Sequence, residues 1–122
     1  MKRTMFVALL FVVAPALASL AAQEVFTSKD DGVTLPTVVR SVKAVYTAAA
    51  MDARIEGMAL LEAVVRADGQ VGEVTVTRSL DMEYGLDTQA VEAVKQWLFK
   101  PGTKDGKAVA VRVTIEIRFT LK

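Results

Sequence analysis

The chain has 122 residues with a formal net charge of +1, and it contains neither cysteine nor histidine. This length fits one small domain, and the balanced charge excludes the strongly basic surface of a nucleic-acid-binding protein. Without cysteine there is no disulfide or thiolate nucleophile, and without histidine the commonest metal ligand and general base are missing. We therefore expect a non-enzymatic protein with no catalytic residue, no bound metal and no cofactor.

Residues 1–22 have the three parts of a secretory signal peptide. A basic pair is followed by the apolar run Met5–Ala14, and the small residues that come next fit cleavage between Ala18 and Ala22. We expect an exported protein that loses this segment. The alternative is that residues 5–22 remain as a membrane anchor, since they are close to the minimum length of about 17 residues that spans a bilayer.

Residues 23–37 are predicted to be a short flexible lead, and residues 38–122 form the domain proper. Within Val33–Val39 we expect an extended piece on the surface, because Pro36 confines a strand to an edge or to its start.

The segment Val38–Val45 fits a strand or a helix equally well. Thr47–Ile55 favours a short N-terminal helix because it holds three successive alanines. We expect this helix to end near Gly57, which suits the left-handed conformation that often closes a helix.

A β-hairpin is predicted next, with strands over Gly57–Arg66 and Val71–Leu80. The Asp68-Gly69 pair between them supplies the positive φ that a tight turn needs. Apolar residues alternate along both strands, so one face of each strand is expected in the core. The residues on that face are Ala59, Leu61, Ala63, Val65, Val74 and Val76.

The main helix is predicted over Thr88–Leu98, with Asp87 as its N-cap and Pro101 ending it near Phe99. Its apolar residues recur at helical spacing and form one stripe that packs on a sheet. We expect Trp97 and Phe99 to anchor the end of the helix in the core. The stripe consists of Ala90, Val91, Val94, Trp97 and Leu98.

After a loop over Gly102–Gly106, apolar and polar residues alternate from Ala108 to Leu121, which predicts a strand. This strand is long for a small domain, where strands of about 5–6 residues are usual. One face carries Val109, Val111, Val113, Ile115, Ile117, Phe119 and Leu121, and the other carries Arg112, Thr114, Glu116 and Arg118.

These elements predict an α+β fold: a three-stranded mixed sheet in the order second–first–third, with the main helix packed on one face and the short helix before it. The second and third strands run parallel, with the first antiparallel between them. The core is expected to contain Leu61, Val76, Val94, Trp97 and Phe99.

The long last strand therefore lies at an edge of the predicted sheet, and an apolar edge strand invites pairing with another chain. Three interpretations remain open: the Val33–Val45 segment covers the edge, a second copy pairs with it, or a peptide adds to it as a strand.

The remaining polar clusters favour structural roles. Asp81, Glu83 and Asp87 lack the regular spacing of a calcium loop. Glu62 and Glu116 would lie on adjacent strands, but neighbouring arginines make a salt-bridged sheet face the better interpretation.

The region Gly32–Leu121 resembles the C-terminal domain of TonB-type energy transducers. The motifs that carry the resemblance are Leu86-Asp87, Trp97, Phe99-Lys100-Pro101 and Lys104-Asp105-Gly106-Lys107, followed by the alternating last strand.

The resemblance implies a periplasmic domain that acts in TonB-dependent transport across the outer membrane. In such domains a short peptide of an outer-membrane receptor, the receptor box, adds as a strand beside the last strand. The residues that would form this peptide-binding edge are Val111, Arg112, Val113, Thr114, Ile115, Glu116 and Ile117.

Two departures from the family argue against contact with a proton-driven motor complex of the ExbB/ExbD type. The chain has no histidine, whereas complete transducers carry one in the anchor helix, and it lacks a proline-rich spacer. We expect a free binding domain or one driven by another protein. The alternatives are a self-associating structural or adaptor domain that uses the same edge for homodimers, and an inner-membrane-anchored form facing the periplasm.

Overall fold

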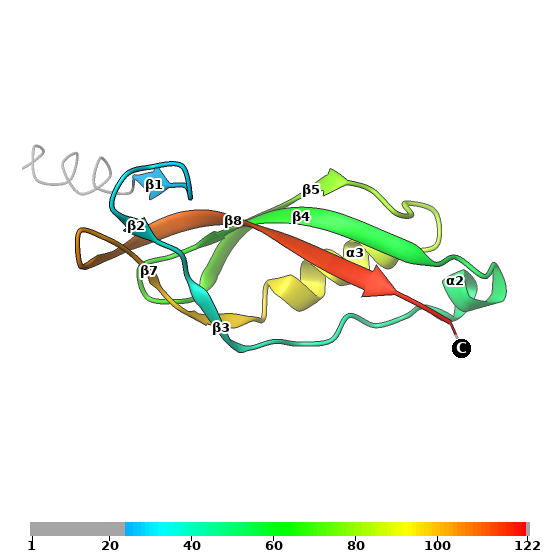
Figure 1. Cartoon of the computed structure of the whole chain (residues 1–122). Helices are drawn as coiled ribbons and strands as arrows, with labels where there is room; N and C mark the ends of the chain where they lie inside the picture. The colour runs from blue at the N-terminus through cyan, green and yellow to red at the C-terminus, as the bar shows by residue number, and fades with distance from the viewer. Residues whose placement is uncertain (1–23, 122) are drawn as a thin grey trace, which may run out of the picture.

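The computed structural model describes residues 24–121, so the predicted signal peptide lies outside the described residues. The fold is α+β, as predicted, and Figure 1 shows an elongated twisted sheet with α3 on one face. The elements are β1 (Val25–Phe26), β2 (Val33–Thr34), β3 (Thr37–Arg40), α2 (Ala48–Asp52), β4 (Gly57–Val65), β5 (Val71–Arg78), α3 (Leu86–Val94), β6 (Leu98–Lys100), β7 (Gly102–Lys104) and β8 (Lys107–Phe119).

The main sheet has the strand order β2-β7-β8-β4-β5, and β1 pairs with β8 beside this path. β4 runs antiparallel to β8 along its whole length, from Gly57 opposite Phe119 to Val65 opposite Val111. The predicted sheet of three strands was too small, since the sheet has six strands within the described residues. The additional strands are two or three residues long, too short to show an alternating pattern.

The hydrophobic core lies between α3 and one face of the sheet. The alternating residues of β4 predicted for this face, Ala59 to Val65, are fully buried, as is Val111 of β8. Leu61 and Val94, which were predicted for the core, are fully buried too, and Phe99 is 8% exposed. Val76 and Trp97 are half-buried and pack against this cluster.

The bounds predicted for the main helix were wrong at both ends. α3 begins after Gly85, whose φ is +92°, and ends at Val94, so Asp87 lies inside the first turn and is not the N-cap. Leu98 belongs to β6 and is 38% exposed. Trp97 leaves the helical stripe because its Nε1 donates a hydrogen bond of 2.9 Å to the carbonyl of Val42.

Asp81 and Asp87 fix the start of α3 by hydrogen bonds to backbone. The Asp81 carboxylate accepts from the N–H groups of Glu83, Tyr84 and Leu86 at 2.9–3.0 Å. The Asp87 carboxylate accepts from the N–H groups of Leu80 and Asp81 and from the Ser79 hydroxyl. Burial alone would raise the pKa of Asp81, but its three backbone hydrogen bonds outweigh burial and lower the pKa below its ordinary value.

The segment before β4 also departs from expectation. The short helix α2 starts at the predicted place, with Thr47 as N-cap, but ends at Asp52. Arg54 takes the left-handed conformation expected nearer Gly57, with φ +58°. The ambiguous segment 38–45 begins as the end of β3 and continues without regular structure. None of the helices in residues 24–121 is long and apolar enough to cross a membrane.

We predict that Leu61→Ala destabilises the domain by about 2–5 kcal/mol, because it removes a fully buried side chain and leaves a cavity. Urea unfolding measures the change. Thr75→Ala, on the exposed face of β5, is the matched control and should stay within about 0.5 kcal/mol of the wild type. Equal effects of the two substitutions would contradict the placement of the core.

We predict that Asp81 makes the domain acid-sensitive. Since its pKa is lowered by folding, its stabilising effect is complete above its ordinary pKa of 3.8 and is lost as the pH falls through the folded value. Asp81→Asn should therefore destabilise the domain at pH 7 and differ less from the wild type at pH 3. Urea unfolding at both pH values tests this, with the exposed Asp52→Asn as control; a pH-independent difference would contradict the assignment.

Candidate functional site

The outer edge of β8 is the candidate site. Val111 pairs with Val65 of β4 and also with Phe26 of β1. A residue in a sheet has one neighbouring strand on each side, so β1 and β4 lie on opposite sides of β8. On the β1 side, only Ala110 and Val111 are paired, and no strand within the described residues pairs with Arg112–Phe119. We call Arg112–Phe119 the open edge.

The predicted peptide-binding residues fall on this edge with one exception. Arg112, Val113, Thr114, Ile115, Glu116 and Ile117 all belong to the open edge. Val111 does not, because it is fully buried and paired on both sides. The open edge also continues beyond the predicted set, to Arg118 and Phe119.

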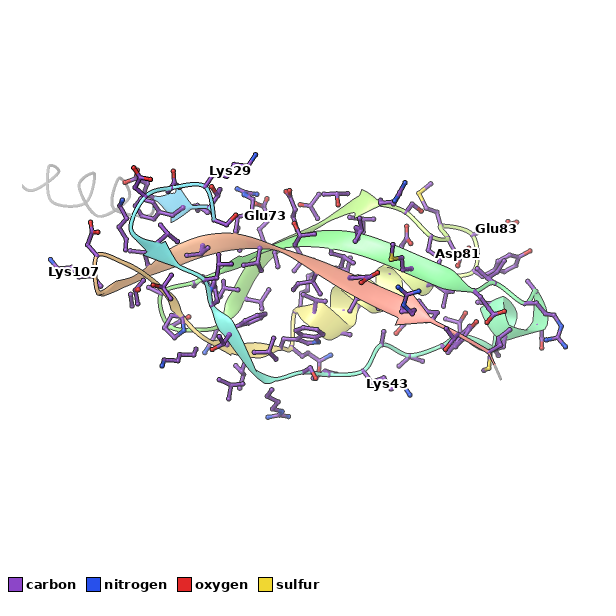
Figure 2. The ribbon with its side chains drawn as sticks, in the orientation of Figure 1. Lys29, Lys43, Glu73, Asp81, Glu83 and Lys107 are labelled. Carbon is purple, nitrogen blue, oxygen red and sulfur yellow. The ribbon has the colours of Figure 1, made fainter. Side chains whose placement is uncertain are left out.

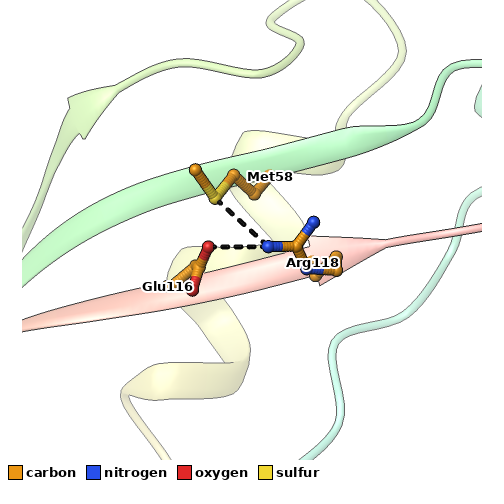
Figure 3. A network of polar contacts seen from close by, with 3 residues as sticks. All are labelled: Met58, Glu116 and Arg118. Atoms are coloured by element: carbon orange, nitrogen blue, oxygen red, sulfur yellow. Dashed lines mark hydrogen bonds and ion pairs between the residues drawn. The ribbon is translucent and has the colours of Figure 1, made fainter.

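The two faces of the open edge differ in chemistry. Ile115, Ile117 and Phe119 point into the core, and the half-buried Val113 packs against it. On the other face, Arg118 forms an ion pair of 2.9 Å with Glu116 and contacts Met58, as Figure 3 shows. Arg112 lies 3.8 Å from Glu62 of β4. These ion pairs are partly exposed and therefore weak, so the polar face can exchange partners at little cost.

The segment 41–47 flanks the open edge without pairing with it. The Tyr46 ring packs edge-on against Phe119, with ring centroids 5.4 Å apart, and the Tyr46 hydroxyl donates to the carbonyl of Ile55. Burial, and secondarily the charge of Glu56, raises the pKa of Tyr46. In Figure 1 the segment passes beside the C-terminal half of β8.

Val33–Val45 does not pair with the open edge, so the interpretation that this segment covers the edge was wrong. Val33 and Thr34 pair with β7, and β3 pairs with β6. Of the three interpretations of the edge, addition of a peptide and pairing with a second copy remain.

The N-terminal lead, expected to be flexible, is folded. We call Glu24–Thr34 the N-terminal clasp: β1 pairs in parallel with β8, a turn over 27–32 follows, and β2 pairs antiparallel with β7. The Asp105 N–H donates to the carbonyl of Gly32 at 3.0 Å, and Lys104 Nζ donates to the carbonyl of Asp31. The sequence showed no periodicity from which this clasp could be found.

The carboxylate clusters have structural roles here. Asp81 and Asp87 use their oxygens on backbone N–H groups, and Glu62 and Glu116 each have an arginine partner. Across the described part of the chain, no group of three or more acidic residues could hold a metal ion. Figure 2 shows Lys107, which lies next to the tip of the β7–β8 hairpin, at one end of the molecule. Asp81 and Glu83 lie at the opposite end.

Residues 42–121 match the family model described as the C-terminal domain of the Gram-negative bacterial TonB protein. The chain belongs to this family. It is 37% identical over 103 residues to Protein TonB of Vibrio cholerae, which covers 84% of this chain and 42% of that protein. It is 41% identical over 76 residues to Protein tonB2 of Pseudomonas aeruginosa, which covers 62% of this chain and 28% of that protein.

The chain thus spans less than half the length of these relatives. The solution NMR structure of the Pseudomonas aeruginosa TonB C-terminal domain has the same fold, with a TM-score of 0.58 and 24% sequence identity over 79% of this chain and 93% of that one. The resemblance inferred from the sequence motifs is confirmed at the level of family and fold.

Proposed function

We propose that this protein is a periplasmic TonB-type domain that binds peptides of outer-membrane receptors by strand addition, as part of TonB-dependent transport. The observation that carries the proposal is the open edge of β8 in a domain of this family. The role is binding rather than catalysis.

The backbone of the open edge would supply the affinity. An unpaired strand edge presents N–H and C=O groups that can hydrogen-bond an incoming extended chain. Because β8 is paired with β4 along Val111–Phe119, its backbone is already extended and ordered before the peptide arrives. The peptide alone would then lose conformational entropy on binding.

The side chains would supply the specificity. Side chains alternate along an added strand, so half of them would lie on the core side of the sheet, beside Val113 and Ile115. The other half would lie beside Thr114, Glu116 and Arg118 on the polar face. This arrangement favours a peptide in which apolar residues alternate with polar or charged ones.

A homodimer through the same edge is the alternative function. In an antiparallel pair of β8 strands centred on Thr114, Arg112 of one copy would face Glu116 of the other. Cross-strand pairs of opposite charge stabilise a sheet modestly, so the open edge is compatible with a second copy. Sedimentation at micromolar concentration separates the two functions: a strictly monomeric protein excludes the dimer.

Titration of the mature protein with fluorescently labelled receptor-box peptides measures the affinity, and the amide chemical shifts of the protein locate the binding site. The two measurements together test the main proposal. We expect shifts that are concentrated on Arg112–Phe119. Several such peptides that bind nowhere on β8 would overturn the proposal.

A charge variant refines this test. We predict that Glu116→Lys changes the preference between two peptides that differ only in one Lys or Asp on the polar face. Removing a neighbouring acid and adding a base should favour the Asp peptide by about 2–5-fold in Kd, the range of an exposed ion pair.

Glu73→Lys, on β5, is the matched control because it makes the same change of net charge at an exposed glutamate outside the open edge. It should leave the preference unchanged. If both variants shift the preference equally, the effect is one of net charge and the location of the site is wrong.

A further inference from the structure

The N-terminal clasp holds the β7–β8 hairpin on two edges. β1 lies on the edge of β8, with Val25 opposite Ala110 and Phe26 opposite Val111. β2 lies on the edge of β7, with Val33 opposite Lys104 and Thr34 opposite Thr103. Figure 1 shows β1 and β7 on opposite sides of β8, with the turn between β1 and β2 passing near the hairpin tip. The clasp therefore wraps this end of the sheet.

β1 occupies the same edge of β8 that stays open further along. Phe26 pairs with Val111, and the next residue of β8, Arg112, is the first of the open edge. A strand added to Arg112–Phe119 and extended past Arg112 would meet β1 in the same place. The clasp and an incoming peptide are therefore competitors for Ala110 and Val111.

The contacts of β1 are few compared with those of β4. β1 has two residues in register with β8, whereas all nine residues of β4 are in register with it. Val25 is 36% exposed, and the half-buried Phe26 ring lies 5.8 Å below the ammonium group of Lys104. The attachment depends further on Gly32, whose φ of +75° brings the turn close to Asp105. A Cβ atom on Gly32 would lie 2.3 Å from Asp105 Oδ1.

We propose that β1 is a built-in competitor strand that limits the peptide-binding edge of β8. With the clasp closed, an added strand pairs with Arg112–Phe119; with β1 released, the edge extends through Val111 and Ala110. Because β1 is part of the same chain, its effective concentration at the edge is high although its contacts are few. A peptide long enough to pair beyond Arg112 must displace β1. Its apparent Kd is then its intrinsic Kd divided by the fraction of molecules in which β1 is released.

This inference rests on the proposed function, and two variants open the clasp at different points. Phe26→Ser removes the ring that lies under Lys104, and Gly32→Val places a side chain against Asp105 at a positive φ. Val39→Ser is the control, because Val39 is 69% exposed on β3, a strand that within residues 24–121 pairs only with β6. Amide hydrogen exchange over residues 25–26 and 110–111 reports whether β1 has left β8.

The probe is a labelled receptor-box peptide long enough to pass Arg112. We expect both open variants to bind it about 3–10-fold more tightly than the wild type, with amide shifts that extend to Val111 and Ala110. In the wild type and in Val39→Ser, binding should be weaker, and shifts at Val111 and Ala110 should appear only at peptide concentrations high enough to displace β1.

The outcomes separate the two proposals. Equal affinities and equal shifts in all four proteins, with β1 released in the variants, would overturn the competitor role and leave the peptide site intact. Binding to none of the four would overturn both proposals. Binding to all four proteins, with the two open variants binding more tightly than the wild type and Val39→Ser, would support both.

Discussion

The fold depends on the antiparallel pairing of β8 with β4. It brings Ala59, Leu61, Ala63 and Val65 opposite Ile117, Ile115, Val113 and Val111 on one face of the sheet. Two of the four β4 residues are alanines, so the side chains on the sheet are short at the centre of the core. Ala90 and Ala93 of α3 are buried there as well. Short side chains on both surfaces allow a helix to lie close to a sheet, and close packing is what a core without disulfides requires.

The difference in length between these two strands determines the rest of the sheet. β8 has 13 residues and β4 has nine. The first residues of β8 therefore project beyond β4, and β7 folds back on them through the two-residue turn Asp105-Gly106, with φ values of +51° and +86°. These values match the turn type that suits the natural twist of a hairpin. The projecting hairpin is the feature that the N-terminal clasp surrounds.

The sequence predicted the parts of this structure whose pattern repeats. Alternation over β4, β5 and β8 gave the buried face, since the side-chain period of a strand is fixed. The prediction from sequence failed where a single tertiary contact overrides a local conformational preference. Asp87 has the chemistry of an N-cap, but its carboxylate is already bonded to the backbone at Leu80 and Asp81. Trp97 continues the helical stripe in sequence, but the carbonyl of Val42, 55 positions earlier, accepts its Nε1 hydrogen bond.

The open edge of β8 was predicted nearly in full because alternation and the family motifs point to the same strand. The clasp was missed, since β1 and β2 are each two residues long and their partners are distant in sequence. The only local sequence signals were Gly32 and the Asp105-Gly106 pair, which favour the positive φ values found there, and neither signal identifies a partner strand.

The clasp and the charged face of the open edge both protect the unpaired edge of β8. Every sheet edge exposes unpaired backbone groups that promote aggregation unless something protects them. Along β8 the charges of Arg112, Glu116 and Arg118 lie on the polar face, so they weaken unspecific association but leave the backbone edge accessible. At Ala110 and Val111, where the β8 side chains are small or buried and uncharged, that protection is missing, and β1 pairs with the backbone itself. Side-chain charge thus protects the part of the edge that the proposed partner strand would use, and backbone pairing protects the part that has no charge.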